Sequence, residues 1–288
     1  MTAMTGVQTR GSAPNSAMLL LAGLLEQRTG QQLAPNRAWR LEATLTPLLR
    51  ERGHATLDDL VVELIGSRDG TLGDRVVEAL LNGETFFYRD AGVIDLAVSA
   101  LEQRAGRSHA GRLRIWSAGC STGQEPLSLA MLIAERNLGG GTFPEIVATD
   151  VSDGALARAR AGRFTQFEIQ RGLPIRRMIE WFDASGDGWV ARPALLSRVH
   201  FRRHNLMIDA PPAGGFDLVL CRNVMLYFAP AQRRQVFDSL ASALRPGGLL
   251  VLGAGETVIG QTELFQPSPE WRGFYERAGE RAVLRRTA

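Results

Sequence analysis

The chain has 288 residues, of which 45% are hydrophobic, and it carries a net charge of +3 at neutral pH. This length and composition suffice for one or two domains with buried cores, and they exclude a wholly disordered chain. Two cysteines far apart in the sequence exclude a disulfide framework, and no apolar run reaches the roughly 20 residues that span a bilayer. We therefore expect a soluble cytoplasmic protein without a metal, and the basic balance favours an acidic partner.

The N-terminal part of the chain has the pattern of a small helical domain. Residues 1–16 are small and polar and are predicted to be disordered. Over residues 17–81 apolar side chains recur every three or four positions, which is helical spacing, and glycines separate the segments. Asn36 and Thr56 precede such segments and have the side chains of helix N-caps. An all-α domain is thus predicted over residues 17–81.

From residue 107 to residue 288 the pattern changes to that of an α/β domain, after a predicted linker and first helix over residues 82–106. Short runs of branched apolar residues alternate with helical patterns, as in a parallel sheet covered by helices. An irregular stretch over about 164–199 contains the turn DASGDGWV, which predicts a small antiparallel insertion. The predicted strands are residues 113–117, 145–149, 216–221 and 249–253, with a helix after each of the first three.

Glycine and acidic residues follow two of these strands, at the edge of the sheet where doubly wound folds bind ligands. The turn SAGCSTGQEP carries Gly119 and Gly123, and it suits a dinucleotide, a mononucleotide, S-adenosylmethionine or a purely structural turn. Asp150 ends the second strand, where an acidic side chain binds ribose hydroxyls; its alternative role is capping the next helix, which Ser152 is also able to do. Glu125 can pair with an ammonium group, as in S-adenosylmethionine, although a first-turn glutamate also suits any helix dipole.

Six segments in one order resemble a single protein family. The predicted strand ending at Cys221 runs directly into CRNVMLYF. The other five segments are NGETFFYRD (82–90), SAGCSTGQEPLSLAM (117–131), ATDVSDGALARARAGRF (148–164), RGLP (171–174) and FRRHNL (201–206). From about residue 20 to its C-terminus the chain resembles the chemotaxis receptor methyltransferases, which are protein-glutamate O-methyltransferases.

The resemblance implies a Rossmann-like class I methyltransferase domain behind a small all-α domain, with a small antiparallel β insertion. It also implies transfer of a methyl group from S-adenosyl-L-methionine to glutamate side chains of chemoreceptors, with S-adenosyl-L-homocysteine as the product. Carried onto matching positions, the cofactor-binding residues are Gly83, Thr85, Arg89, Gly119, Glu125, Asp150, Asn205, Leu206, Arg222 and Asn223, and the catalytic residues are Arg89 and Tyr227.

The implied roles differ along the cofactor. The resemblance places Asp150 at the ribose, Asn205 and Leu206 at the adenine, and Glu125, Arg222 and Asn223 at the methionyl end. Arg89 would draw in the substrate carboxylate and Tyr227 would orient it beside the transferring methyl. One departure is Gly83, where many relatives have asparagine, while Asn82 stands one position early. Two implied features also have a plain packing explanation, because Leu206 and the aromatic residues of TFFYR suit a buried core.

The implied partner is the acidic helical bundle of a chemoreceptor, docked through Arg37, Arg40, Arg50 and Arg52, although a solvated helix face explains these charges equally well. A monomer without a nucleic-acid partner is expected. Two other functions stay open: a cofactor-binding regulatory module without activity, and a nucleic-acid methyltransferase, for which the sequence lacks an NPPY-type site. A nicotinamide-dependent dehydrogenase is disfavoured, because Asn223 and Tyr227 have no histidine or lysine nearby in sequence to handle a hydride.

Overall fold

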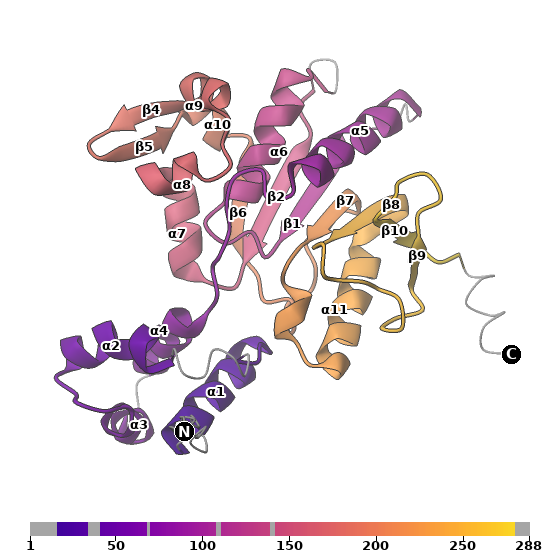
Figure 1. The fold of residues 1–288 in the computed structure, drawn as a ribbon. Coiled ribbons are helices and arrows are strands. Elements are labelled where there is room, and N and C mark those ends of the chain that lie inside the picture. The colour runs from indigo at the N-terminus through magenta and orange to yellow at the C-terminus, as the bar shows by residue number, and fades with distance from the viewer. Residues whose placement is uncertain (1–15, 34–40, 68–69, 108–110, 139–141, 280–288) are drawn as a thin grey trace, which may run out of the picture. The chain divides into compact units, whose positions relative to one another are not determined.

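The computed structural model describes residues 16–33, 41–67, 70–107, 111–138 and 142–279. The chain divides into two compact units, residues 1–81 and residues 82–288, so the helical pattern and the α/β pattern fall in different units (Figure 1). Within the described ranges, no helix combines the length and the apolar composition needed to cross a membrane.

The described part of the N-terminal unit contains four helices: α1 (Ser16–Thr29), α2 (Leu41–Arg52), α3 (Leu57–Gly66) and α4 (Thr71–Leu80). A capping box begins α3, since the Thr56 side chain accepts a hydrogen bond from Asp59 N and the Asp59 side chain accepts one from Thr56 N. The predicted cap at Thr56 is confirmed, whereas Asn36 lies outside the described residues. Ser16, at the end of the segment predicted to be disordered, begins α1, and the rest of that segment is also outside the described residues. Buried leucines and valines join all four helices in one core.

In the described part of the C-terminal unit, seven strands form the main sheet in the order β6-β2-β1-β7-β8-β10-β9. Counted along the chain within this sheet, the order reads 3-2-1-4-5-7-6. The first five strands of this order are parallel, and β10 is antiparallel to both of its neighbours. The expected Rossmann-like α/β fold is therefore confirmed. The strands are β1 (Arg114–Ala118), β2 (Glu145–Asp150), β6 (Val199–Arg203), β7 (Phe216–Cys221), β8 (Leu244–Leu252), β9 (Phe265–Pro267) and β10 (Phe274–Arg277).

All four predicted strands are present, but the last one starts earlier than predicted. β8 begins at Leu244 instead of residue 249, because Leu244 pairs with Phe216 before a register shift, although the following PGG is typical of a turn. Strand β6 escaped prediction because its VHFRR sequence lacks an apolar run, and it lies at the edge of the sheet with exposed side chains. Sequence patterns thus identified the four central strands β2, β1, β7 and β8, and missed β6, β9 and β10.

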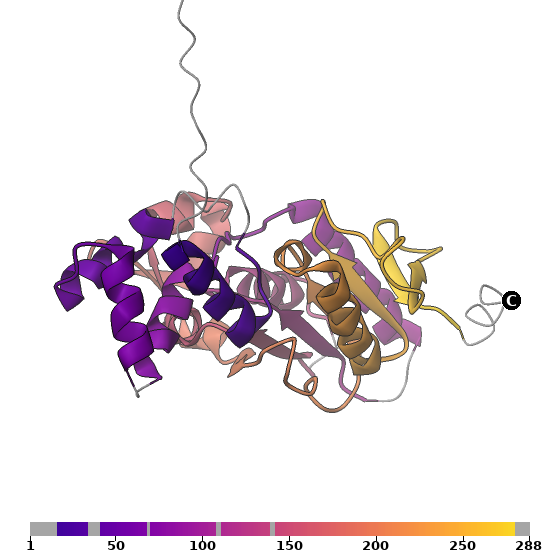
Figure 2. The ribbon, with the colours of Figure 1, turned by 90° about the horizontal axis from the view of Figure 1, so that it is seen from below.

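Successive side chains of a central strand point to opposite faces of the sheet and pack in two different cores. On β7, Leu218 and Leu220 pack with α5, α6 and α7, whereas Val219 and Cys221 pack with α11. Helices α5 and α11 accordingly lie on opposite sides of the sheet (Figure 2). The helices are α5 (Ala91–Arg107), α6 (Gln124–Glu135), α7 (Asp153–Ala161) and α11 (Pro230–Ala243).

A small antiparallel subdomain is inserted between α7 and β6, as predicted. Its three strands pair in the order β3-β5-β4, and the turn between β4 and β5 contains Gly186 with a φ of 61°. The ring of Phe87, from the segment before α5, meets the rings of Phe164 and Phe182 edge-on at 5.0 and 5.5 Å between centroids. The elements of the inserted subdomain are β3 (Arg163–Thr165), α8 (Gln166–Gln170), α9 (Ile175–Trp181), β4 (Phe182–Ser185), β5 (Gly188–Ala191) and α10 (Pro193–Leu196).

Candidate active site

The glycine-rich turn after β1 is held tightly between the ends of two other strands. Gly119 and Gly123 have φ angles of 78° and 93°, a region that favours glycine. Gly119 N and Cys120 N donate hydrogen bonds to Thr149 O at the end of β2, at 2.8 and 2.9 Å. A β carbon on Gly119 would lie 2.5 Å from a methyl of Val224, which follows β7. The turn therefore depends on a glycine at this position.

Asp150 at the end of β2 faces this turn. One oxygen of its carboxylate accepts a hydrogen bond from Ser121 N at 2.7 Å, and the other accepts one from Ser152 N at 2.9 Å. Ser152 itself caps α7, because its hydroxyl accepts a hydrogen bond from Ala155 N at 2.8 Å. The capping role is thus performed by Ser152, and Asp150 links the second strand to the glycine-rich turn. Each oxygen of a carboxylate has two lone pairs, so it can accept a hydrogen bond from more than one donor.

A charged cluster lies at the end of β7 beside the same turn. The side chain of Arg222 is only 2% exposed, and its Nη1 donates to Glu125 Oε2 at 3.0 Å. Its Nη2 donates to Asp90 Oδ2 at 2.5 Å and to the carbonyl oxygen of Arg89 at 3.0 Å. The other oxygen of Glu125 accepts a hydrogen bond from Ser117 Oγ at 2.8 Å. Asp90 was missed by the sequence interpretation, although it directly follows Arg89 in the segment NGETFFYRD.

The segment over residues 82–90 crosses this site and contacts the chain after β7 and the glycine-rich turn. Asn82 donates a side-chain hydrogen bond to the hydroxyl of Tyr227, and Gly83 O accepts one from Ser121 Oγ at 2.8 Å. The guanidinium of Arg89 donates to a backbone carbonyl of its own segment at 3.3 Å. Asn82, which seemed displaced by one position in the sequence, is therefore a second residue that was missed. Its place at the head of NGETFFYRD was the available signal.

The remaining predicted site residues make contacts with other parts of the C-terminal unit. The backbone N of Asn205 donates to Asp209 Oδ2 at 2.7 Å, and its side-chain oxygen accepts from Met207 N at 2.9 Å. Leu206 belongs to the buried core on the α11 side of the sheet, so its packing role is real. Asn223 has a φ of 59° and donates through its backbone N to Glu256. Thr85 is half-buried within the 82–90 segment.

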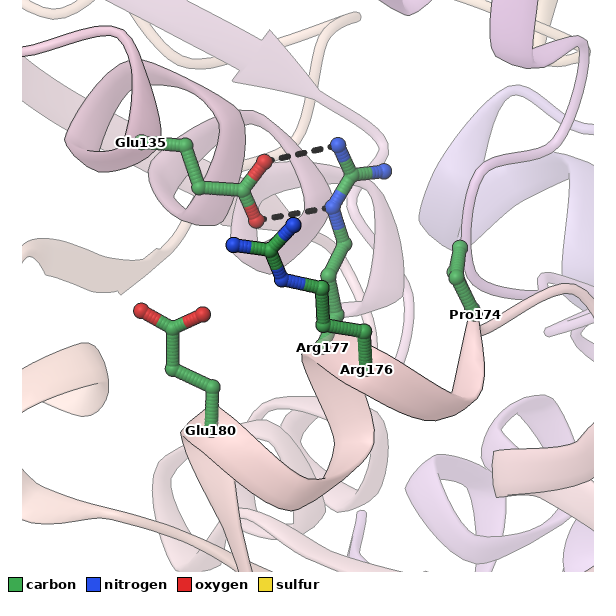
Figure 3. Close-up of a pocket in the computed structure, with 5 residues that line it drawn as sticks. All are labelled: Glu135, Pro174, Arg176, Arg177 and Glu180. Carbon is green, nitrogen blue, oxygen red and sulfur yellow. Dashed lines mark hydrogen bonds and ion pairs between the residues drawn. The ribbon is translucent and has the colours of Figure 1, made fainter.

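The inserted subdomain is fastened to α6 next to this segment. Two nitrogens of Arg177 donate to the two carboxylate oxygens of Glu135 at 2.8 and 2.7 Å (Figure 3), and the guanidinium lies 4.4 Å from the ring centre of Tyr88. An adjoining pocket of about 600 Å³ contains none of the predicted site residues; it is lined by Glu135, Pro174, Arg176, Arg177 and Glu180. Close packing continues at Gly172, where a β carbon would lie 2.0 Å from the carbonyl oxygen of Phe87. The insertion therefore supports the 82–90 segment from outside.

The side chains at these strand ends fit S-adenosylmethionine. Asp150 suits the ribose hydroxyls, and Glu125 suits the ammonium of the methionyl group on the other side of the glycine-rich turn. Nε of Arg222 is buried without a hydrogen-bond partner among the described residues, so a donor is available there for an oxygen of the methionyl end. No group of three or more potential metal ligands occurs in the described ranges. The fold and the site together define an S-adenosylmethionine-dependent methyltransferase.

Comparisons with known proteins specify the family. The family model of the CheR methyltransferase SAM-binding domain matches residues 83–273. Chemotaxis protein methyltransferase 1 of Pseudomonas aeruginosa is 37% identical over 261 residues, which cover 88% of this chain and 95% of that protein. Chemotaxis protein methyltransferase Cher2 of Pseudomonas putida is 36% identical over 248 residues, covering 84% and 90%. The chain belongs to the CheR methyltransferase family.

Among solved structures, the N-methyltransferase NodS of Bradyrhizobium japonicum, in complex with S-adenosyl-L-homocysteine, is 19% identical. The match covers 57% of this chain and 59% of that chain, with a TM-score of 0.34.

Proposed function

We propose that this protein transfers the methyl group of S-adenosylmethionine to glutamate side chains of chemotaxis receptors, forming glutamyl methyl esters. The proposal rests on membership of the CheR family and on the names of the chemotaxis relatives. The observation in the structure that supports it best is the hydrogen bond between Asn82 and Tyr227. Tyr227 ends a short 3-10 helix (Met225–Tyr227) a few residues after Arg222 of the charged cluster, and this bond links its phenol to the 82–90 segment.

The proposed reaction needs positioning more than acid–base catalysis. S-adenosylmethionine supplies an electrophilic methyl group; its bond to sulfur breaks as a bond to a glutamate oxygen forms, and a neutral thioether leaves. A glutamate carboxylate with an ordinary pKa of about 4.3 is already ionised at neutral pH, so no general base is required. Charge is neutralised in this step, and a site that excludes water therefore favours it. The protein's task is to hold the carboxylate oxygen in line.

Tyr227 is suited to that task because of its partner. The Tyr227 oxygen accepts a hydrogen bond from Asn82, and a phenol that accepts a hydrogen bond can also donate its own proton to an incoming carboxylate. Arg89 adds a positive charge on the same 82–90 segment and thereby attracts the substrate. Both residues act on orientation, since a tight ion pair to the nucleophilic oxygen would reduce its reactivity.

An arginine of the N-terminal unit is proposed to take part in receptor docking. Of the four arginines predicted for it, Arg37 and Arg40 lie outside the described residues. Arg52 forms an ion pair with Glu63, which offsets its charge. Arg50 is exposed near the end of α2 and makes no ion pair with another described residue. We assign Arg50 to the acidic receptor bundle as the arginine of this helix whose charge is uncompensated there.

The buried cysteines argue against one form of nucleic-acid methylation. Burial raises the pKa of the thiols of Cys120 and Cys221 well above the ordinary value. Both therefore stay protonated at neutral pH, and a protonated buried thiol is a poor nucleophile. This disfavours a mechanism that attacks a base through a cysteine.

Transfer of labelled methyl from S-adenosylmethionine to a receptor cytoplasmic fragment, followed by mild alkaline treatment, tests the proposal. Label that base releases, and that Asp150→Ala abolishes, is the expected result. Asp153→Ala is the matched control, because this exposed carboxylate three residues further on pairs with Arg203 and lies on α7. Label that resists base, or that appears only on nucleic acid, refutes the proposal. Cofactor binding without transfer to any receptor fragment supports a regulatory module instead.

A further inference from the structure

Asp90 occupies an unusual position that the roles assigned so far leave unexplained. Its backbone φ is 55°, in the left-handed region that asparagine and aspartate tolerate better than most residues. Its carbonyl oxygen accepts a hydrogen bond from Val93 N at 2.7 Å, at the start of α5. Its side chain accepts a hydrogen bond from Nη2 of Arg222.

The charges around Arg222 do not balance. One guanidinium, 2% exposed, contacts two carboxylates, those of Glu125 and Asp90, whose side chains are 13% and 40% exposed. A single carboxylate would neutralise Arg222, so the cluster carries one excess negative charge next to the glycine-rich turn. A partly buried negative charge attracts a cation more strongly than the same charge in water. The methionyl end of the cofactor carries such a cation, its α-ammonium group.

We propose that Asp90 is a positioning residue for the methionyl end of the cofactor, acting through Arg222. Asp90 holds one side of the guanidinium and thereby supplies part of its charge compensation. Glu125 then retains the negative charge needed to bind the α-ammonium, with its second oxygen fixed by Ser117. Without Asp90, Arg222 and Glu125 form a neutral pair, and the ammonium has to compete with the guanidinium for one carboxylate.

Asp90→Asn is the informative substitution because it removes the charge and preserves the shape. Asparagine tolerates a positive φ as well as aspartate does, so the backbone at the start of α5 is kept. Asp90→Ser is a second uncharged variant in case the amide finds a new partner. Asp95→Asn is the matched control, since Asp95 is an exposed acid on α5, the helix that follows Asp90, and pairs with Arg136.

Calorimetric binding of two nucleosides to the full chain tests the proposal, independently of any receptor substrate. S-adenosylhomocysteine carries the methionyl ammonium and carboxylate, whereas 5′-methylthioadenosine lacks both. We expect Asp90→Asn and Asp90→Ser to weaken the binding of S-adenosylhomocysteine about tenfold or more, because a charged contact is lost. The affinity for 5′-methylthioadenosine should stay unchanged. Asp95→Asn should change neither affinity.

Two results overturn this role for Asp90. Equal weakening of both nucleosides means that Asp90 only maintains the fold of the segment before α5. Unchanged binding of S-adenosylhomocysteine means that Glu125 holds the ammonium without help from Asp90.

Discussion

Gly119→Ala tests whether the glycine-rich turn is set by close packing against the segment after β7. The residue has a φ of 78°, and left-handed backbone costs a residue with a β carbon about 1–2 kcal/mol. The added methyl would also lie 2.5 Å from Val224 Cγ2, and overpacking of this kind costs about 1–3 kcal/mol. The two terms together predict a loss of about 2–5 kcal/mol in the free energy of unfolding. Binding of S-adenosylhomocysteine should weaken as well, because the turn also carries the Ser121 contact to Asp150.

Urea denaturation of three further variants separates the two terms. Gly273 has a φ of 83°, and a β carbon added there would meet no atom within 4 Å, so Gly273→Ala should show the backbone cost of about 1–2 kcal/mol alone. Val224→Ala removes the clashing methyls, and the double variant with Gly119→Ala should therefore lose less than the sum of the single losses. The reasoning is refuted if Gly119→Ala costs no more than Gly273→Ala, or if the double variant is simply additive.

Three further outcomes are expected. Tyr227→Phe should lower kcat by on the order of 100-fold through misplacement of the substrate and leave S-adenosylhomocysteine binding unchanged; a loss of binding instead would contradict the orienting role. Asp217→Asn should cost about 3 kcal/mol of unfolding free energy in urea, because the 1% exposed carboxylate pairs with Arg104 and Arg245, and a loss under about 1 kcal/mol would argue against a buried network. Burial lowers the pKa of His204 below 6.5, so the unfolded chain binds more protons there, and stability should fall as pH drops below that value. The His204→Gln variant should therefore lose less stability than the parent chain between pH 7 and pH 5, measured as the urea midpoint of unfolding. An equal loss in both proteins would contradict this prediction.

Much of the fold was predictable because its signals are local. Strand β7 matches its predicted bounds, since both faces of a central strand are buried and its sequence is therefore continuously apolar. Thr56 was recognised as a cap because a capping box spans only four residues. The edge strand β6 was missed for the opposite reason, because its exposed side chains leave no apolar run.

The candidate site was only partly predictable. Asp150, Glu125 and Arg222 stand beside strand ends or glycines, where a pattern points to a ligand, and the structure brings all three to the glycine-rich turn. Asp90 and Asn82 were missed as functional partners. Their contacts join residues 132 and 145 positions apart in the chain, with Arg222 and Tyr227 respectively. No local pattern carries information about such a pair.

The amino-acid sequence by itself therefore determined the central strands, the helix cap at Thr56 and the residue types at the strand ends, because these depend on neighbours within a few positions. Only the tertiary structure decided that Asp150 contacts the glycine-rich turn through Ser121, and that Asp90 shares Arg222 with Glu125. The physical reason is that charge balance and hydrogen-bond partners in the site are set by which strand ends lie side by side. In this protein that is decided by the sheet order, in which β1 lies between β2 and β7.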